Sequence, residues 1–207
     1  MQKHCIMRRK AENSATKNKI LFESFKLFTC KPWSDVVYQD IEKATGFSRG
    51  AILYHIQTKE NLFNEVMKKY VFDRRTSCMV AHAQGLWNNI LLFLSMRENE
   101  KKEFEAMGIM NINRAYTYIA CNALYCGKEM NVLIDQWING EFDYWKTLLT
   151  EAVKNEEIKA DIDIELEARL FLNVFLGTSY SNLASSTGYS LEILKSEFKN
   201  LYDKLKK

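Results

Sequence analysis

Helix-breaking residues are scarce in this sequence, which contains one proline and eight glycines among 207 residues. Proline and glycine end helices and shape the tight turns between strands, so their scarcity excludes a strand-and-turn fold and favours long helices. Hydrophobic residues make up 47% of the chain, which allows a sizeable core and excludes a disordered composition. The sequence therefore predicts an all-α protein.

Long hydrophobic runs are also missing. The run at residues 90–94 is far shorter than the roughly 18 apolar residues of a membrane span. The first residues are polar and basic and lack the apolar stretch of a signal peptide. We therefore expect a cytoplasmic protein with no membrane partner.

Motifs for metal binding and catalysis are absent as well. The five cysteines show no C-x-x-C spacing and the three histidines are scattered. There is no G-x-S-x-G, phosphate loop or H-E-x-x-H motif. We expect no metal, no cofactor and no enzymatic activity, with the cysteines as buried, reduced thiols. Oxidant sensing by Cys121 and Cys126 is an alternative that requires an exposed thiol of low pKa.

Charge is distributed unevenly along the chain. Residues 1–75 carry 15 Lys/Arg and 8 Asp/Glu, a net charge of +7, whereas residues 76–207 carry 14 and 18, a net charge of −4. A basic first part on an acidic body indicates a polyanionic partner for the first part only.

Apolar residues at helical spacing predict four helices within residues 16–63. The first runs from about residue 16 to 30, and Pro32 stops it. Ser34 or Asp35 is expected to cap the second helix.

A tight turn separates the second helix from the third. Gly46 can adopt the left-handed conformation that ends a helix, and Ser48 can cap a short third helix that buries Ile52 and Ile56. Thr58 can cap the fourth. Two short helices joined by such a turn make a helix-turn-helix unit.

The third helix leaves small, polar and basic groups on its outer face. Helix N-termini offer free amide donors to phosphates, and small residues such as Gly50 and Ala51 let the backbone approach a base edge. Glycine in a helix interior costs about 1 kcal/mol against alanine, and close approach to a DNA groove would explain it. The candidate DNA-binding residues are Lys17, Ser48, Arg49, Gly50, Ala51, Leu53, Tyr54, His55 and Lys59.

A different class of function remains open at this point. The protein could be an all-helical interaction module whose helix-turn-helix is structural and binds no DNA. In that case Tyr54 and His55 would be buried, with His55 a packed core histidine.

The segment from about residue 18 to 63 resembles the amino-terminal domain of the TetR family of bacterial transcription regulators. The matching positions are Leu27-Phe28, Trp33, Asp40-Ile41, Gly46, Ser48, Gly50, Leu53 or Tyr54, His55, Lys59-Glu60 and Leu62. The resemblance implies a sequence-specific regulator that binds a double-stranded DNA operator as a homodimer. It further implies a repressor that is released by a small hydrophobic effector.

Four positions depart from the family pattern. Pro32 replaces a glycine, and Val36 replaces the threonine that caps the second helix and touches phosphate. Ala51 replaces a threonine on the reading surface. Glu42 replaces a small alanine between the two helices of the motif, and it is expected either to turn outward or to pair with Arg49.

The resulting domain organisation has three parts. We expect a flexible basic arm over residues 1–15, a helix-turn-helix domain over 16–63, and a helical ligand-binding and dimerisation domain over 64–207. The last is rich in large aromatic residues, most of which must be ordinary core, but a pocket between helices needs a similar lining. The candidate ligand-binding residues are Asn111, Arg114, Tyr116, Tyr118, Asn122, Trp137 and Trp145.

The two last helical segments carry apolar stripes. Residues 191–205 step by three and four, and residues 166–177 form a second stripe. Two such helices per subunit can form an intermolecular four-helix bundle, although the first stripe could instead pack inside one subunit. The candidate dimerisation residues are Leu170, Val174, Phe175, Gly177, Leu194, Phe198 and Leu201.

Overall fold

The computed structural model describes residues 2–73 and 82–207, with side chains from residue 13 onward. Within these residues every regular element is helical, apart from one isolated antiparallel bridge between Ile158 and Lys206. The all-α prediction is therefore confirmed. Among the same residues, no helix combines the length and the apolar character needed to cross a membrane.

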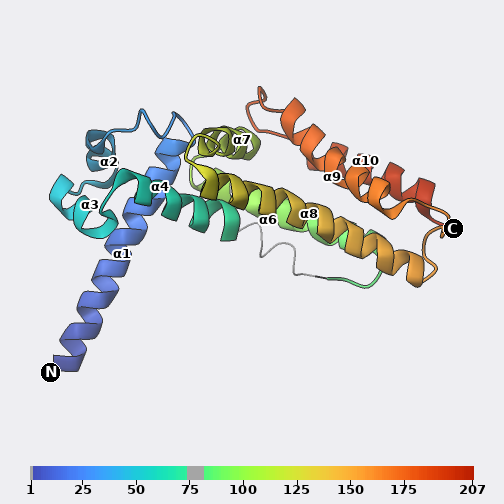
Figure 1. Cartoon of the computed structure of the whole chain (residues 1–207), viewed down its shortest axis with the longest axis horizontal. Coiled ribbons are helices and arrows are strands. Elements are labelled where there is room, and N and C mark those ends of the chain that lie inside the picture. The colour runs from blue at the N-terminus through green and yellow to red at the C-terminus, as the bar shows by residue number, and fades with distance from the viewer. Residues whose placement is uncertain (1, 74–81) are drawn as a thin grey trace. The chain divides into compact units, whose positions relative to one another are not determined.

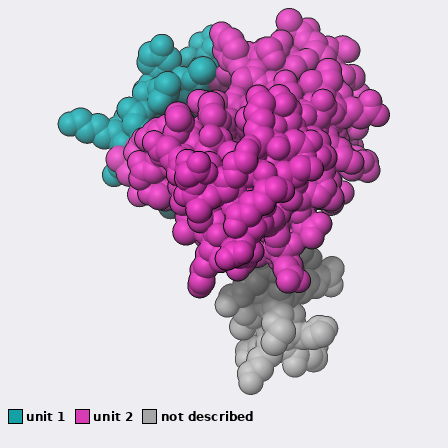
Figure 2. Space-filling view, turned by 90° about the vertical axis from the view of Figure 1, so that its right-hand side faces the viewer, with its two compact units in different colours: residues 1–73, 118–131 teal, residues 74–117, 132–207 magenta. Residues whose placement is uncertain are grey.

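The chain forms two compact units (Figure 2). The first unit comprises residues 1–73 and 118–131, and the second comprises residues 74–117 and 132–207. The first unit thus extends past residue 63, where the helical pattern placed the domain boundary.

The first unit contains a short-helix motif built on one long helix (Figure 1). Its helices are α1 (Gln2–Phe28), α2 (Tyr38–Thr45), α3 (Arg49–Ile56), α4 (Lys59–Met67) and the π-helix η1 (Lys68–Phe72). Helix α1 begins well before residue 16, so the residues expected as an arm form its first turns. Helices α2, α3 and α4 all contact α1, and their shared core contains Ile20, Phe25, Phe28, Ile41, Ile52, Ile56, Leu62, Phe63 and Val66.

Helix α2 begins later than expected and by a different device. The N–H groups of Asp35 and Val36 donate to the carbonyl of Pro32, at 3.0 and 3.2 Å, which forms a turn before the helix. The N-cap residue is Val37, whose side chain cannot accept a hydrogen bond. Its N–H instead donates to the carboxylate of Asp40 at 2.9 Å. The prediction that Ser34 or Asp35 caps α2 is wrong, because the turn at Pro32 takes up both residues.

Helix α4 continues directly into η1, in which the chain makes the wider i to i+5 turn. The buried ring of Tyr70 stacks on Phe25 of α1, with the centroids 4.8 Å apart. The π-helix thus extends the contact between this part of the chain and α1.

The second unit holds most of the longer helices. These are α6 (Leu86–Ala106), α7 (Ile112–Ala123), α8 (Lys128–Lys154), α9 (Ile164–Ser181) and α10 (Leu191–Leu205), of which α7 and α8 each contribute a few residues to the first unit. An aromatic cluster from α6, α8, α9 and α10 forms its core, with ring centroids 5.1 to 5.8 Å apart: Phe93, Trp145, Phe171, Phe175 and Phe198.

Candidate nucleic-acid interface

The ends of the three short helices are fixed by local capping contacts. Gly46 adopts the left-handed conformation (φ 74°) after α2, and its N–H donates to the carbonyl of Glu42 at 2.8 Å. The Ser48 hydroxyl accepts from the N–H of Ala51 at the start of α3. Thr58 caps α4 in the same way, accepting from Asn61 at 3.0 Å. These caps confirm the predicted helix-turn-helix geometry.

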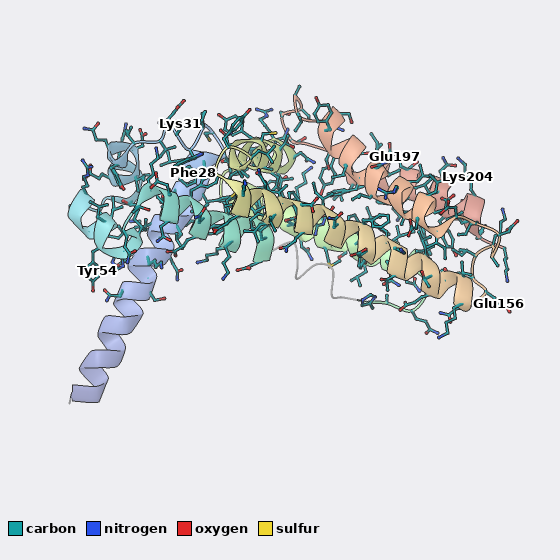
Figure 3. The ribbon with its side chains drawn as sticks, viewed as in Figure 1. Phe28, Lys31, Tyr54, Glu156, Glu197 and Lys204 are labelled. Carbon is teal, nitrogen blue, oxygen red and sulfur yellow. The ribbon has the colours of Figure 1, made fainter. Side chains whose placement is uncertain are left out.

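The outer face of α3 is open to solvent. Gly50 is exposed, and a Cβ added there would meet nothing within 4 Å, so no packing within the chain requires glycine. The Tyr54 side chain is 72% exposed (Figure 3). His55 is half-buried, and its ring lies edge-on to Tyr54 with 5.1 Å between centroids. Ala51 and Leu53 are half-buried beside them. The inner residues Ile52 and Ile56 are fully buried, as predicted.

Arg49 is held from two sides. Its backbone N–H donates to the carboxylate of Glu42 at 2.6 Å. Its guanidinium carbon lies 4.7 Å from the ring centroid of Tyr38, the first residue of α2. Glu42 therefore pairs with the Arg49 backbone, whereas the guanidinium has an aromatic partner, Tyr38, that sequence reasoning missed. Nothing in the sequence signals that contact, since the two residues lie eleven positions apart in different helices.

Lys59 is engaged inside the motif. Its ammonium group donates to the carbonyls of Ser34 and Val36, at 2.8 and 2.9 Å, and lies 5.1 Å from the ring centroid of Trp33. In this geometry Lys59 fixes the turn before α2. Its charge stabilises carbonyl oxygens that no backbone N–H of α4 reaches.

Lys17 has a partner within the same unit. Its ammonium group lies 2.7 Å from the Glu65 carboxylate, and both side chains are partly exposed. The pair joins α1 to α4. An exposed ion pair of this kind contributes little to stability, so a stronger anion could displace the carboxylate.

A second ion pair supports the start of α2. The Lys31 ammonium group, 2.7 Å from the Asp40 carboxylate, lowers the pKa of Asp40, and the hydrogen bond from Val37 adds to this. Because the pKa in the folded protein is lowered, this contribution to stability is present above the unfolded-state pKa. It is lost as the pH falls through the folded-state pKa.

Asn111 and Arg114, two candidates for ligand binding, are used within the second unit. The Asn111 amide donates to the carbonyls of Asn182 and Ser185, at 3.1 and 2.7 Å, and its Oδ1 accepts from the Arg114 N–H. The Arg114 guanidinium donates to the carbonyls of Leu183 and Ser185, at 2.9 and 2.8 Å. Both residues thus bind the loop between α9 and α10 to the start of α7.

The three aromatic candidates of the second unit fall into two environments. The buried Tyr116 hydroxyl donates to Glu100 at 2.6 Å, and its ring lies 6.5 Å from that of Trp137. Trp137 is half-buried and donates to Glu141 at 3.2 Å. Trp145 is fully buried in the aromatic cluster and is therefore a core residue.

The remaining two ligand candidates belong to the first unit. Tyr118 and Asn122 are both half-buried, and the Asn122 amide donates to the Tyr118 carbonyl at 2.8 Å. This bond lies along one turn of α7.

The described cysteines are less buried than expected. Cys30 and Cys121 are exposed and Cys126 is half-buried, while the side chains of Cys5 and Cys78 lie outside the described residues. Burial raises the pKa of Cys126 to about 11. This is the opposite of what an oxidant-sensing thiol needs, so the structure argues against that role for Cys126.

We expect Cys126 to react slowly with iodoacetamide in the native protein at pH 8. Its pKa of about 11, against an ordinary 9.0, leaves about a hundredfold less thiolate. Labelling can be followed by mass spectrometry of peptides, with the exposed Cys121 as the internal control. Equal rates at the two cysteines in folded protein would contradict the expectation.

The dimerisation candidates divide sharply by burial. Phe175, Leu194 and Phe198 are 3%, 0% and 0% exposed, so they are core residues of one subunit. Helix α10 packs its apolar stripe on α6 and α9, including the half-buried Leu201. The stripe on α10 therefore lies inside the subunit, and the prediction of an interface role for these buried residues is wrong.

The exposed apolar face of this region is on α9. Leu170 is 39% exposed, Val174 is half-buried, and Gly177 is exposed with open space where a Cβ would be. Leu166 and Tyr180 on the same helix are more exposed still.

The first unit therefore defines the chain as a helix-turn-helix protein. No protein-family model matches the sequence. The structure, however, is similar to solved structures over most of its length. A TetR-family transcriptional regulator from Agrobacterium tumefaciens matches with a TM-score of 0.73 at 11% sequence identity, covering 94% of this chain and 100% of that one.

Two further similar structures agree. A transcriptional regulator from Saccharomonospora viridis, in complex with choline, has a TM-score of 0.70 at 14% identity, with 94% of this chain and 99% of that one covered. NalD from Pseudomonas aeruginosa, the secondary repressor of the MexAB-OprM multidrug efflux pump, has a TM-score of 0.66 at 16% identity, with coverage of 95% and 98%. The chain has the fold of the TetR-family transcriptional regulators.

Proposed function

We propose that the protein is a sequence-specific DNA-binding transcriptional regulator. One observation carries this proposal: the outer face of α3 combines an exposed, unpacked Gly50 with a largely exposed Tyr54. A helix interior that only had to be stable would gain from alanine at position 50. A major groove needs the backbone of the reading helix to come close to the base edges.

The proposed DNA contacts differ in character. Arg49, Gly50, Ala51 and Tyr54 lie at or beside the open face of α3 and are assigned to base or backbone contacts, with Ser48, Leu53 and His55 at its margin. Lys59 holds the turn before α2, so its influence on DNA binding is assigned to that turn. Lys17 can bind phosphate by exchanging its partner Glu65.

The alternative is an interaction module with a structural helix-turn-helix. That reading requires Tyr54 and His55 to be packed, whereas Tyr54 is 72% exposed and His55 is half-buried. The deciding experiment is selection of bound duplexes from a random DNA pool, followed by titrations over a range of salt concentrations. Enrichment of one sequence with a steep salt dependence supports the regulator, and weak binding without enrichment rejects it.

A homodimer is proposed through the exposed face of α9. Leu166, Leu170 and Tyr180 expose apolar surface there, and Gly177 lets a second helix approach closely. Twofold symmetry then places two copies of α3 on half-sites of a palindromic operator. The selected sequence should show that palindrome.

We further propose a repressor that a small hydrophobic effector releases. The choline complex of the Saccharomonospora viridis protein and the repressor role of NalD support this direction. Because Asn111 and Arg114 are used in holding a loop and Trp145 in the core, Trp137 and Tyr116 are the stronger candidates for lining an effector site. Titration of apolar and cationic compounds, read by tryptophan fluorescence and operator binding together, tests this. An effector must bind with a change in both signals.

A further inference from the structure

The N-terminus of α3 is already occupied by a negative charge of the protein. The first N–H of the helix, on Arg49, donates to the Glu42 carboxylate at 2.6 Å. The N–H of Ala51 donates to the Ser48 hydroxyl. Two amide donors at this terminus are therefore satisfied from within the helix-turn-helix unit.

A helix N-terminus is otherwise a favourable place for a phosphate. Its free amide groups and the positive end of its dipole attract anions. At α3 the Glu42 carboxylate takes the position of such an anion, and it would repel a DNA phosphate that approached the same donor.

The Arg49 side chain does not cancel this effect by pairing with Glu42. Its guanidinium group lies over the ring of Tyr38, 4.7 Å from the centroid, while Glu42 binds the backbone of the same residue. The arrangement keeps a cation directed along α2 and an anion at the tip of α3. Glu42 and Arg49 are separated in function although they are in contact.

We infer that Glu42 is a specificity-determining residue: its carboxylate keeps a DNA phosphate away from the N-terminus of α3. Binding then depends more on base contacts from the outer face of α3 and less on sequence-independent backbone contacts. This inference rests on the proposed function. Glu42 itself acts by exclusion and need not touch a base.

The test compares Glu42→Gln with the wild-type protein on the selected operator and on a scrambled duplex of equal length. Glutamine keeps an oxygen that can accept the Arg49 N–H but removes the charge. We expect binding to the scrambled duplex to tighten by roughly threefold to tenfold, and log K to fall more steeply with log salt by about 0.9, the value for one phosphate. Operator binding should change less, so the ratio of the two affinities falls.

Two further variants separate the charge from its alternatives. Glu42→Ala removes the hydrogen bond as well, so a purely structural role predicts a defect in the alanine variant and wild-type behaviour in the glutamine variant. Glu60→Gln removes the same charge from an exposed residue in the first turn of α4. Equal shifts for Glu60→Gln and Glu42→Gln would assign the effect to net charge and overturn the inference.

Failure of the inference and failure of the proposed function give different results. If the wild-type protein selects no DNA sequence, the proposed function fails and the inference with it. If the wild-type protein selects an operator and Glu42→Gln leaves both affinities and the salt slope unchanged, only the inference is overturned.

Discussion

Replacing Gly50 by alanine should stabilise the protein and at the same time weaken its binding to the operator. The site is exposed, helical and without neighbours around a Cβ, so alanine should add up to about 1 kcal/mol to the free energy of unfolding. The same methyl group would hold the α3 backbone away from the base edges. We expect operator affinity to fall by about tenfold, which is about 1.4 kcal/mol, and by more with a larger side chain.

The opposite signs make this prediction specific. Thermal unfolding and operator titration on the same preparation provide both values. Ile52→Val is the matched control, because Ile52 is buried on the inner face of the same helix. It should lose about 0.5 to 1.5 kcal/mol of stability and bind the operator as the wild type does. A Gly50→Ala protein that gains stability and binds normally would remove glycine from the proposed interface.

Leu170→Glu should produce folded monomers, whereas Phe198→Ala should damage folding itself. Leu170 lies on the exposed face of α9, so a charge there desolvates only when a second subunit covers it. Phe198 is fully buried in the aromatic cluster, and its truncation should cost about 3 to 5 kcal/mol.

Sedimentation and circular dichroism at the same concentrations distinguish the two results. The milder Leu170→Ala variant should weaken the dimer without adding a charge, which guards against a monomer that unfolds. A dimer of unchanged strength in both Leu170 variants would exclude the α9 face as the interface.

The parts of the site that depend on neighbouring residues could be predicted from the sequence. Gly46, Ser48 and Thr58 fix their helix ends through contacts within four residues, and such contacts follow from residue type and position. The burial of Ile52 and Ile56 follows equally from helical spacing.

The parts that depend on distant contacts could not be predicted. The 3-4-3-4 spacing in α10 establishes one apolar face, but not whether that face meets its own subunit or a second one; the burial of Leu194 and Phe198 shows the former. Likewise, Lys59 has the residue type of a phosphate ligand, yet its ammonium group reaches carbonyls more than twenty residues earlier. Charged residues with long side chains have several partners within reach, so sequence alone does not select one.

The π-helix at the end of α4 makes the length of this stretch more important than its composition. The buried residues here come in pairs four positions apart: Leu62 and Phe63, Val66 and Met67, and Tyr70 and Val71. An α-helix turns once in about 3.6 residues, so each step of four overshoots by roughly 40°. The wider turn over Lys68–Phe72 rotates the chain less per residue and returns the third pair to the face of the first two. Apolar residues can replace one another in such a pair, but deletion of one residue would turn all that follows by about 100° and separate Tyr70 from Phe25.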